Sequence, residues 1–219
     1  IGSSQRQYNF KQDQDPVEYL HRHGQSIVNQ RELGPDTTSF ADAVRQVLRQ
    51  DPDVICIGEI RDLATVRTAL TLAETGHLVL TTVHTSDAPQ AISRIIDIFP
   101  QHEQQGVRTQ LSLCLQGVLV QQLLPDAKGT GRWLATELMV ATPAVRNLIR
   151  ENNLQQLRSS IETGSKDGMH SKNASLIALE RAGKVTVETA IEASNDIKGI
   201  LRELARTHPE LSTGSRLSQ

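Results

Sequence analysis

Two short apolar runs constrain the fold of this chain more than any other feature of its sequence. Residues 53–58 read DVICIG and residues 78–83 read LVLTTV. Continuous β-branched runs of this length are typical of strands that are buried on both faces of a sheet. Between them, residues 63–75 carry apolar side chains at helical spacing, and Asp62 stands where it caps a helix. The sequence therefore predicts a β–α–β unit.

Further elements are predicted on both sides of this unit. Ser39 can cap a helix that runs through Arg49, and strands that alternate with helices favour a parallel α/β sheet. Residues 101–124 are predicted as one long helix, and residues 133–140 as a last strand. Short helices are then expected at 144–151, 154–162, 173–182, 186–193 and 196–206.

Composition limits the classes of function. With 37% hydrophobic and 22% charged residues the chain can build a packed core, and aliphatic side chains must fill it because aromatics are only 3%. The formal net charge is −2, which provides no basic field for nucleic acid. No window approaches the roughly 18–20 apolar residues of a membrane span, and no signal segment opens the chain. We expect no nucleic-acid binding, no membrane insertion and a cytoplasmic location.

Cysteine and histidine spacing gives no metal-site pattern. Cys56 and Cys114 have no neighbour at CxxC spacing, so both are expected to be buried, reduced core residues. His21 and His23 lie two residues apart in a predicted turn and are not expected to be ligands. The chain begins at Ile1 rather than at Met, and we expect it to be a fragment of a longer protein.

An acidic residue follows the first predicted strand. Glu59 comes directly after residues 53–58, and in parallel α/β folds ligands bind at the carboxyl ends of the strands. A carboxylate there can hold the water shell of Mg²⁺ and orient or deprotonate the water that attacks a γ-phosphate. An acid after a strand can equally be a helix cap, so the residues alone leave both readings open.

A histidine follows the second predicted strand. His84 would lie beside Glu59, where an imidazole can contact a phosphate or report the nucleotide state to a neighbour, or can simply bond to turn carbonyls. Asp13, Asp15 and Glu18 surround a proline near the start of the chain and on their own form an ordinary acidic loop.

The sequence contains no phosphate-binding loop of the form G-x-x-x-x-G-K-[ST]. In that loop glycine amides and a lysine surround the phosphates, and the hydroxyl binds Mg²⁺. The one Gly-Lys pair, Gly183-Lys184, is followed by Val185, and Ala178 stands five residues before Gly183.

Taken together and in this order, the segments resemble the type II/type IV secretion ATPase superfamily, and most closely its pilus-retraction branch of the PilT type. DPVEYLHRHGQSIVNQRE is similar to the family's aspartate box and the stretch after it, and DPDVICIGEIRDLATVRTALTLAETGHLVLTTVHT to its Walker B and histidine boxes. The resemblance implies an α/β, RecA-like P-loop NTPase core, incomplete at its N-terminus, in residues 1–125. It implies a mostly helical C-terminal region in 126–206, before a loose tail at 207–219.

One further segment is similar to the AIRNLIRE motif of retraction ATPases and differs from it at its second residue. The same segment can also be a plain packing helix, because its apolar residues fall on one side. The motif residues are Ala144, Val145, Arg146, Asn147, Leu148, Ile149, Arg150 and Glu151. With two cysteines in the chain, the four-cysteine zinc module of extension-type relatives cannot be present.

The resemblance also implies a function. The intact protein would be a homohexameric ring at the cytoplasmic face of the bacterial inner membrane. It would bind ATP with Mg²⁺, hydrolyse it and act on the inner-membrane pilus platform protein to retract a type IV pilus in twitching motility. Glu59 would be the catalytic Walker B acid, which holds Mg²⁺ through water and not directly. Nucleotide-site residues of the aspartate and histidine boxes would be Asp15, Glu18, His77 and His84.

Two departures from the family pattern limit this reading. Gln14 stands where the family's aspartate box has a glutamate, and an amide can orient a water but cannot take its proton. The phosphate-binding loop would have to lie upstream of Ile1. We therefore expect this chain alone to be inactive, and keep the alternative of a catalytically inactive interaction module or gene remnant of a secretion ATPase.

Overall fold

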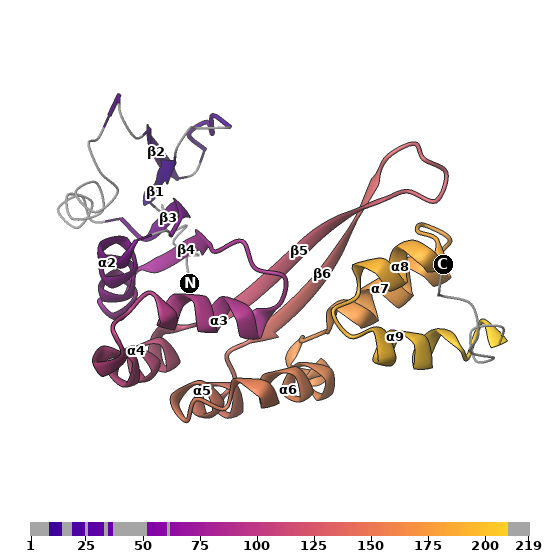
Figure 1. Cartoon of the computed structure of the whole chain (residues 1–219). Helices are drawn as coiled ribbons and strands as arrows, with labels where there is room; N and C mark the ends of the chain where they lie inside the picture. The colour runs from indigo at the N-terminus through magenta and orange to yellow at the C-terminus, as the bar shows by residue number, and fades with distance from the viewer. Residues whose placement is uncertain are drawn as a thin grey trace, which may run out of the picture. The chain divides into compact units, whose positions relative to one another are not determined.

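The computed structural model shows an α/β protein that divides into two compact units (Figure 1). The first unit is formed by Ile1–His84 and Ser93–Leu115, and the second by Thr85–Ile92 and Gln116–Gln219. The structure describes residues 9–14, 19–24, 26–32, 35–36, 52–60 and 62–209, of which 9–14 by backbone alone. The helix expected from Ser39 to Arg49 lies outside the described residues.

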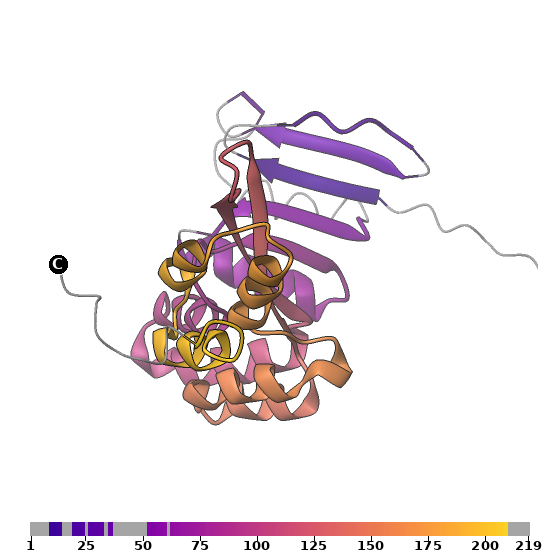
Figure 2. The ribbon, with the colours of Figure 1, turned by 90° about the vertical axis from the view of Figure 1, so that its right-hand side faces the viewer.

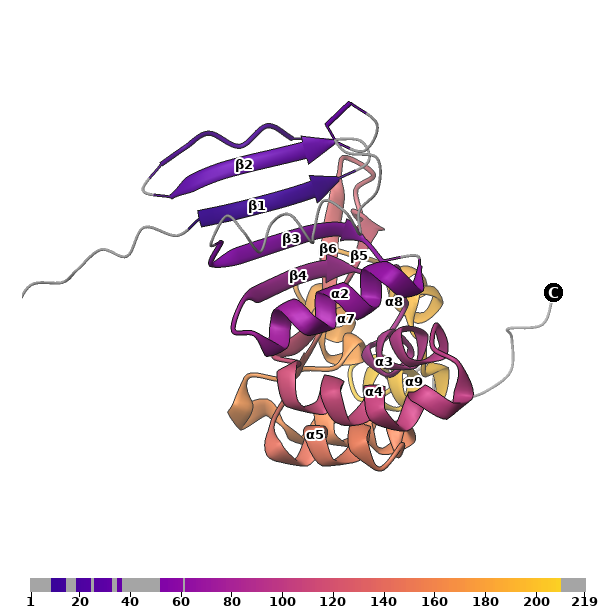
Figure 3. The same ribbon diagram turned by 90° about the vertical axis from the view of Figure 1, so that its left-hand side faces the viewer.

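The first unit contains a parallel sheet with the strand order β2-β1-β3-β4 (Figure 3). Helix α2 (Leu63–Glu74) connects β3 to β4 and contacts both β4 and α4 (Gln101–Cys114). The predicted β–α–β unit is therefore confirmed. The strands are β1 (Asn9–Gln14), β2 (Ile27–Glu32), β3 (Val54–Glu59) and β4 (Leu78–Thr82).

The two apolar strands of this sheet differ in burial. Ile55 and Ile57, on one face of β3, are fully buried, whereas Val54 and Cys56, on the other face, are half-buried. Leu78 and Leu80 of β4 are 45% and 46% exposed, so the prediction of a strand buried on both faces is wrong for β4. The physical reason is its place in the sheet, since β4 ends the strand order and β3 is its one partner among the described strands.

The second unit is built on a two-stranded antiparallel ribbon of β5 (Gly117–Pro125) and β6 (Arg132–Val140). The helix predicted over 101–124 ends in fact at Cys114, and the prediction is wrong for the strand that follows. Val118 and Leu119 continue the helical spacing of Leu111 and Leu115, whereas Val118, Val120 and Leu124 fit a period of 2, so the pattern alone could not distinguish the two structures. Gly117 fits closely against β6, because a Cβ there would lie 2.9 Å from the carbonyl oxygen of Met139.

Helices cover one face of this ribbon. Helix α7 lies along it and contacts β6, while α8 contacts β5 (Figure 1 and Figure 2). The core of the unit consists of Leu124, Ala135, Leu176, Ile177, Val185, Ala190, Ala193, Ile200 and Leu204. Helices assigned to this unit are α5 (Pro143–Arg150), α6 (Leu157–Thr163), α7 (Lys172–Arg181), α8 (Val187–Ala193) and α9 (Ile197–Leu204), with 3₁₀ turns at Leu154–Gln156 and Ser165–Asp167.

Helix α3 (Ala88–Asp97) begins in the second unit and ends in the first. The domain division expected after residue 125 differs from this grouping, which assigns β5 and the start of α3 to the second unit. In the part of the chain that the structure describes, no helix is long and apolar enough to cross a membrane.

Truncation of a core leucine should destabilise the second unit. Leu176 is fully buried, and Leu→Ala at such sites costs about 2–5 kcal/mol of the free energy of unfolding. We predict a loss of this size for Leu176→Ala, measured by urea unfolding with the fluorescence of Trp133, the single tryptophan of the chain, which lies on β6. Leu119→Ala is the matched control, because Leu119 is 54% exposed on β5. Equal midpoints for the two variants would contradict the assigned core.

Candidate functional site

The parallel pairing of β3 with β4 brings two candidate residues together at the carboxyl edge of the sheet. Glu59 is the last residue of β3, and His84 follows two residues after the end of β4. The distance between His84 Nε2 and Glu59 Oε2 is 3.5 Å. The Glu59 side chain is 19% exposed and that of His84 is 64% exposed, so the carboxylate is partly shielded while the imidazole faces solvent.

Local backbone geometry sets the position of this pair. The β3–β4 register shifts between Ile57 and Glu59, which places Glu59 opposite Thr82. The Thr82 hydroxyl donates a hydrogen bond of 2.5 Å to the carbonyl oxygen of Gly58, and the Ile60 amide donates to the carbonyl of Thr82. Irregularities of this kind bend a strand and redirect its side chains. His84 itself has a φ of +46°, in the left-handed region that non-glycine residues rarely adopt.

The structure shows which residue caps helix α2. Helix α2 is capped by Asp62, whose Oδ1 accepts a hydrogen bond of 2.9 Å from the Thr65 amide and whose Oδ2 accepts one of 2.6 Å from the Thr65 hydroxyl. The predicted cap at Asp62 is confirmed. Glu59 therefore has no capping role at α2, and its carboxylate lies instead beside the imidazole of His84.

His77 does not join this pair. It immediately precedes β4, whereas His84 follows its far end, so the two histidines lie at opposite edges of the sheet. Its Nδ1 is 3.1 Å from both the Leu72 carbonyl oxygen and the Thr75 hydroxyl oxygen. These contacts tie His77 to the turn after α2.

The aspartate-box residues are described only in part. Asp15 and Glu18 lie outside the described residues. Gln14 ends β1, and because Asp13 pairs with Ile57 in parallel register, the backbone of Gln14 reaches the same sheet edge as Glu59. The residue that departs from the family pattern is thus, by its backbone, at the edge where the sequence places the chemistry.

The two cysteines are only partly buried, and His21 and His23 make local contacts. Cys56 and Cys114 are half-buried, less than the sequence predicted. His23 Nδ1 accepts a hydrogen bond of 3.0 Å from the Val28 amide, and the His21 ring contacts that of Tyr19 edge-on.

One carboxylate of this chain is enough to serve a Mg²⁺ ion that is bound together with a nucleotide. Within the described ranges no group of three or more histidine, cysteine or acidic side chains is arranged to hold a metal. Mg²⁺ in nucleotide sites keeps several waters and takes one or two carboxylates plus phosphate oxygens, so it needs no such protein cage. Glu59 can serve it through water.

The segment that resembles the retraction motif forms helix α5. Thr142 caps the helix by accepting from the Val145 amide, and Val145 and Ile149 are fully buried. Arg150 is exposed, and its Nη2 donates to Asn147 Oδ1 at 2.6 Å. Arg146 is half-buried and its Nε donates to the Ala141 carbonyl at 2.8 Å, so it is not a fully exposed charge.

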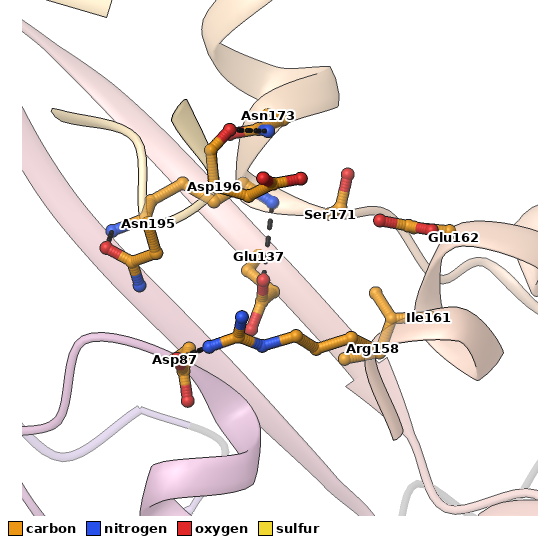
Figure 4. A pocket seen from close by; sticks show the side chains of 10 residues that line it. Asp87, Glu137, Arg158, Ile161, Glu162, Ser171, Asn173, Asn195 and Asp196 are labelled. Atoms are coloured by element: carbon orange, nitrogen blue, oxygen red, sulfur yellow. Dashed lines mark hydrogen bonds and ion pairs between the residues drawn. The ribbon is translucent and has the colours of Figure 1, made fainter. Parts of the chain in front are cut away.

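Sequence reasoning missed a polar cluster in the second unit. Its acidic members, Asp87 and Glu137, are 3% and 8% exposed. The cluster surrounds a cavity of about 70 Å³ (Figure 4). We define the polar cluster as Asp87, Glu137, Arg158, Lys172 and Asn195. One signal was available, because Glu137 interrupts the apolar strand WLATELMV.

In open α/β sheets ligands bind at the carboxyl ends of the strands, which is where Glu59 and His84 lie. Residues 3–184 match the family described as Type II/IV secretion system protein, and the chain belongs to this family.

Its relatives include pilus motors. The chain is 48% identical over 177 residues to a twitching motility protein of Neisseria gonorrhoeae, covering 81% of this chain and 47% of the relative. It is 47% identical over 179 residues to the type IV pilus retraction ATPase PilT of Pseudomonas aeruginosa, covering 82% of this chain and 52% of the relative. The chain spans about half the length of these curated relatives.

A solved structure confirms the fold. The crystal structure of the pilus retraction motor PilT with bound ADP superposes with a TM-score of 0.83 at 51% identity and covers 90% of this chain and 56% of that one. The predicted α/β core is confirmed, and the chain is homologous to PilT-type retraction ATPases.

The cap at Asp62, which follows the Walker B segment, should make stability depend on pH. Hydrogen bonds from Thr65, its hydroxyl first, hold the pKa of Asp62 below its ordinary value. A lowered carboxyl pKa stabilises the fold at neutral pH, and this contribution is lost as pH falls through the lowered pKa. We predict that Asp62→Ala lowers the free energy of unfolding by about 1 kcal/mol at neutral pH. In acid, the free energies of unfolding of the variant and the parent should become more similar.

Urea unfolding followed by circular dichroism across a pH series measures this difference. Asp97→Ala is the control, since Asp97 is an exposed aspartate at the end of α3, where a carboxylate is unfavourable to the helix dipole. If the difference in free energy of unfolding between Asp62→Ala and the parent were the same at every pH, the cap would not depend on the charge of Asp62.

Proposed function

We propose that this chain is the part of a pilus-retraction ATPase that supplies the hydrolytic acid, the neighbouring histidine and the retraction helix. The observation that carries the proposal is the 3.5 Å approach of His84 Nε2 to Glu59 Oε2 at the carboxyl edge of a parallel sheet. Homology to a motor whose solved structure holds ADP supports a nucleotide as the ligand.

Each residue has a distinct task in this proposal. The Glu59 carboxylate orients the attacking water and accepts its proton as the water approaches the γ-phosphate of ATP. Mg²⁺, when bound, neutralises charge on the phosphates. His84, exposed beside Glu59, contacts the phosphate region and reports its occupancy, while Asp15 and Glu18 complete the site from the aspartate box.

The phosphate-binding loop has to come from residues outside these 219, because their sequence contains none. Among the described strands β4 lies at the edge of the sheet, which supports a further strand there. Exposed strand edges and exposed leucines are normally covered, and Leu78 and Leu80 are both nearly half exposed.

The proposed assembly is the one that the family resemblance implies. It is a homohexamer at the cytoplasmic face of the inner membrane that acts on the inner-membrane platform protein of a type IV pilus. Within the second unit, α5 keeps Val145 and Ile149 in the core and turns Arg150 to solvent, which suits a helix that contacts another molecule.

A second candidate function is a catalytically inactive interaction module. Gln14 favours it, because β1 ends at this residue and an amide side chain cannot take a proton from water. Under this alternative the sheet and α5 keep their surfaces while turnover is lost.

A hybrid protein tests the two functions, because only the motor hydrolyses ATP, and one substitution in it tests the role of Glu59. In a hybrid in which this chain replaces the matching half of the Pseudomonas aeruginosa relative, we predict that Glu59→Gln lowers ATP turnover by roughly 10²–10⁴-fold, because the general base is lost. ATP affinity should stay within about threefold, since the binding contacts remain. Steady-state hydrolysis and calorimetric titration measure the two quantities.

Glu74→Gln is the matched control, because its carboxylate lies on α2 and accepts a hydrogen bond from Gln110. It should hydrolyse ATP at the parent rate. A parent hybrid that binds ATP but does not hydrolyse it would favour the inactive module.

The retraction helix gives a separate prediction. Arg150→Ala in the hybrid should preserve melting temperature and ATP turnover, because exposed charges change stability by less than about 0.5 kcal/mol. It should fail to restore twitching motility in cells that lack the relative. Arg202→Ala on α9 is the control and should restore twitching. We leave Arg146 unchanged because its bond to the Ala141 carbonyl would confuse folding with function. Normal twitching by Arg150→Ala would leave α5 as a packing helix.

A further inference from the structure

Thr82, the last residue of β4, is bonded to the peptide groups on both sides of Glu59. Its hydroxyl donates a hydrogen bond of 2.5 Å to the carbonyl oxygen of Gly58. Its own carbonyl oxygen accepts one of 3.2 Å from the amide of Ile60. One residue of β4 therefore holds β3 immediately before and immediately after the acid, and all four residues belong to the first unit.

The β3–β4 ladder contains an extra residue at this point. The pairing is regular up to Ile57, which stands opposite Thr81. The next pair joins Glu59, and not Gly58, to Thr82. Two residues of β3 thus oppose one residue of β4, which is the arrangement of a β-bulge. Because side chains alternate between the two faces of a strand, this shift of one residue decides which face carries the Glu59 carboxylate.

The Thr82 hydroxyl satisfies the backbone group that the bulge displaces. A bulge leaves the extra residue outside the regular ladder, and backbone carbonyls need a hydrogen-bond donor. Gly58 is the extra residue, and the threonine side chain donates to its carbonyl oxygen. Valine has nearly the shape of threonine but no donor, whereas serine keeps the donor. The hydroxyl can therefore be removed and restored with little change in side-chain volume.

The same residue also fixes where the chain leaves β4 for His84. His84 lies two residues after Thr82, and two residues of chain span at most about 7 Å. Its φ of +46° is a conformation that persists only where the surrounding chain imposes it. The imidazole Nε2 is 3.5 Å from the Glu59 carboxylate. A change at Thr82 therefore acts on both members of this pair.

We propose that Thr82 is a positioning residue for the Glu59–His84 pair: its hydroxyl holds the bulge at Gly58 and thereby sets the carboxylate beside the imidazole. This inference rests on the proposed function for what the pair does, and not for its geometry. Since Thr82 acts through Glu59, its loss should lower the rate of hydrolysis more than the affinity for ATP.

The first test uses the 219-residue chain without nucleotide. In Thr82→Val we expect the Ile60 amide to exchange with solvent about tenfold faster, as loss of one hydrogen bond at the bulge allows. We also expect the imidazole NMR signals of His84, assigned with His84→Gln, to shift at one fixed pH at which the ring is neutral. Thr82→Ser restores a donor and should return both readouts to the parent values.

Thr81→Val is the matched control, because Thr81 is the neighbouring exposed threonine of β4 and pairs in the regular part of the ladder. It should leave both readouts unchanged. The inference is overturned if Thr82→Val leaves the His84 signals as in the parent, or if Thr81→Val shifts them equally. A lower melting temperature of Thr82→Val with unchanged His84 signals also overturns it, since the hydroxyl would then stabilise the sheet without positioning the pair.

The second test uses the hybrid with the Pseudomonas aeruginosa relative. Thr82→Val should lower kcat for ATP by at least about tenfold and change KM by less than about threefold, because the acid is misplaced while the binding contacts remain. Thr82→Ser should recover the parent kcat, and a parent-like kcat in Thr82→Val would overturn the inference. If the parent hybrid hydrolyses no ATP, the proposed function fails, and the amide exchange and His84 signals of the 219-residue chain still decide the positioning role.

Discussion

The parallel pairing of β3 with β4 is the constraint on which the site depends. It aligns the carboxyl ends of the two strands, and it brings Glu59 within 3.5 Å of His84 although the two residues are separated by the whole of α2. Without the sheet, Glu59 and His84 would not be neighbours. The irregular register at Glu59 adds the last adjustment, because it places the acid opposite Thr82 at the edge where the strand ends.

Strong local signals explain how much of the fold the sequence predicted. The β–α–β unit was marked by two apolar runs and by the cap at Asp62, each of which acts over a few residues. The errors arose where local pattern does not decide. Residues 117–124 satisfy both periods, and the choice of strand depends on the pairing of β5 with β6. The exposure of Leu78 depends on which strands flank β4, which spacing does not encode.

The same distinction applies to the site. Glu59 and His84 were predicted because each follows a strand directly, and parallel strands end at one edge. The polar cluster was not, because its bonds join residues far apart in the sequence, 49 positions between Ala88 and Glu137 and 109 between Ser86 and Asn195. Arg146 is a local example of the same limit. Helical spacing predicts which face of the helix it lies on, but not its hydrogen bond to the Ala141 carbonyl.

The backbone of His84 connects these observations. A non-glycine residue in the left-handed region costs on the order of 1–3 kcal/mol and persists only when its surroundings impose it. On one side β4 is fixed to β3 through the hydrogen bonds of Thr82. On the other side, Ser86 and Ala88 are bonded to Asn195 and Glu137. The left-handed backbone of His84 therefore lies between a strand that is bonded to β3 and a segment that is bonded within the second unit.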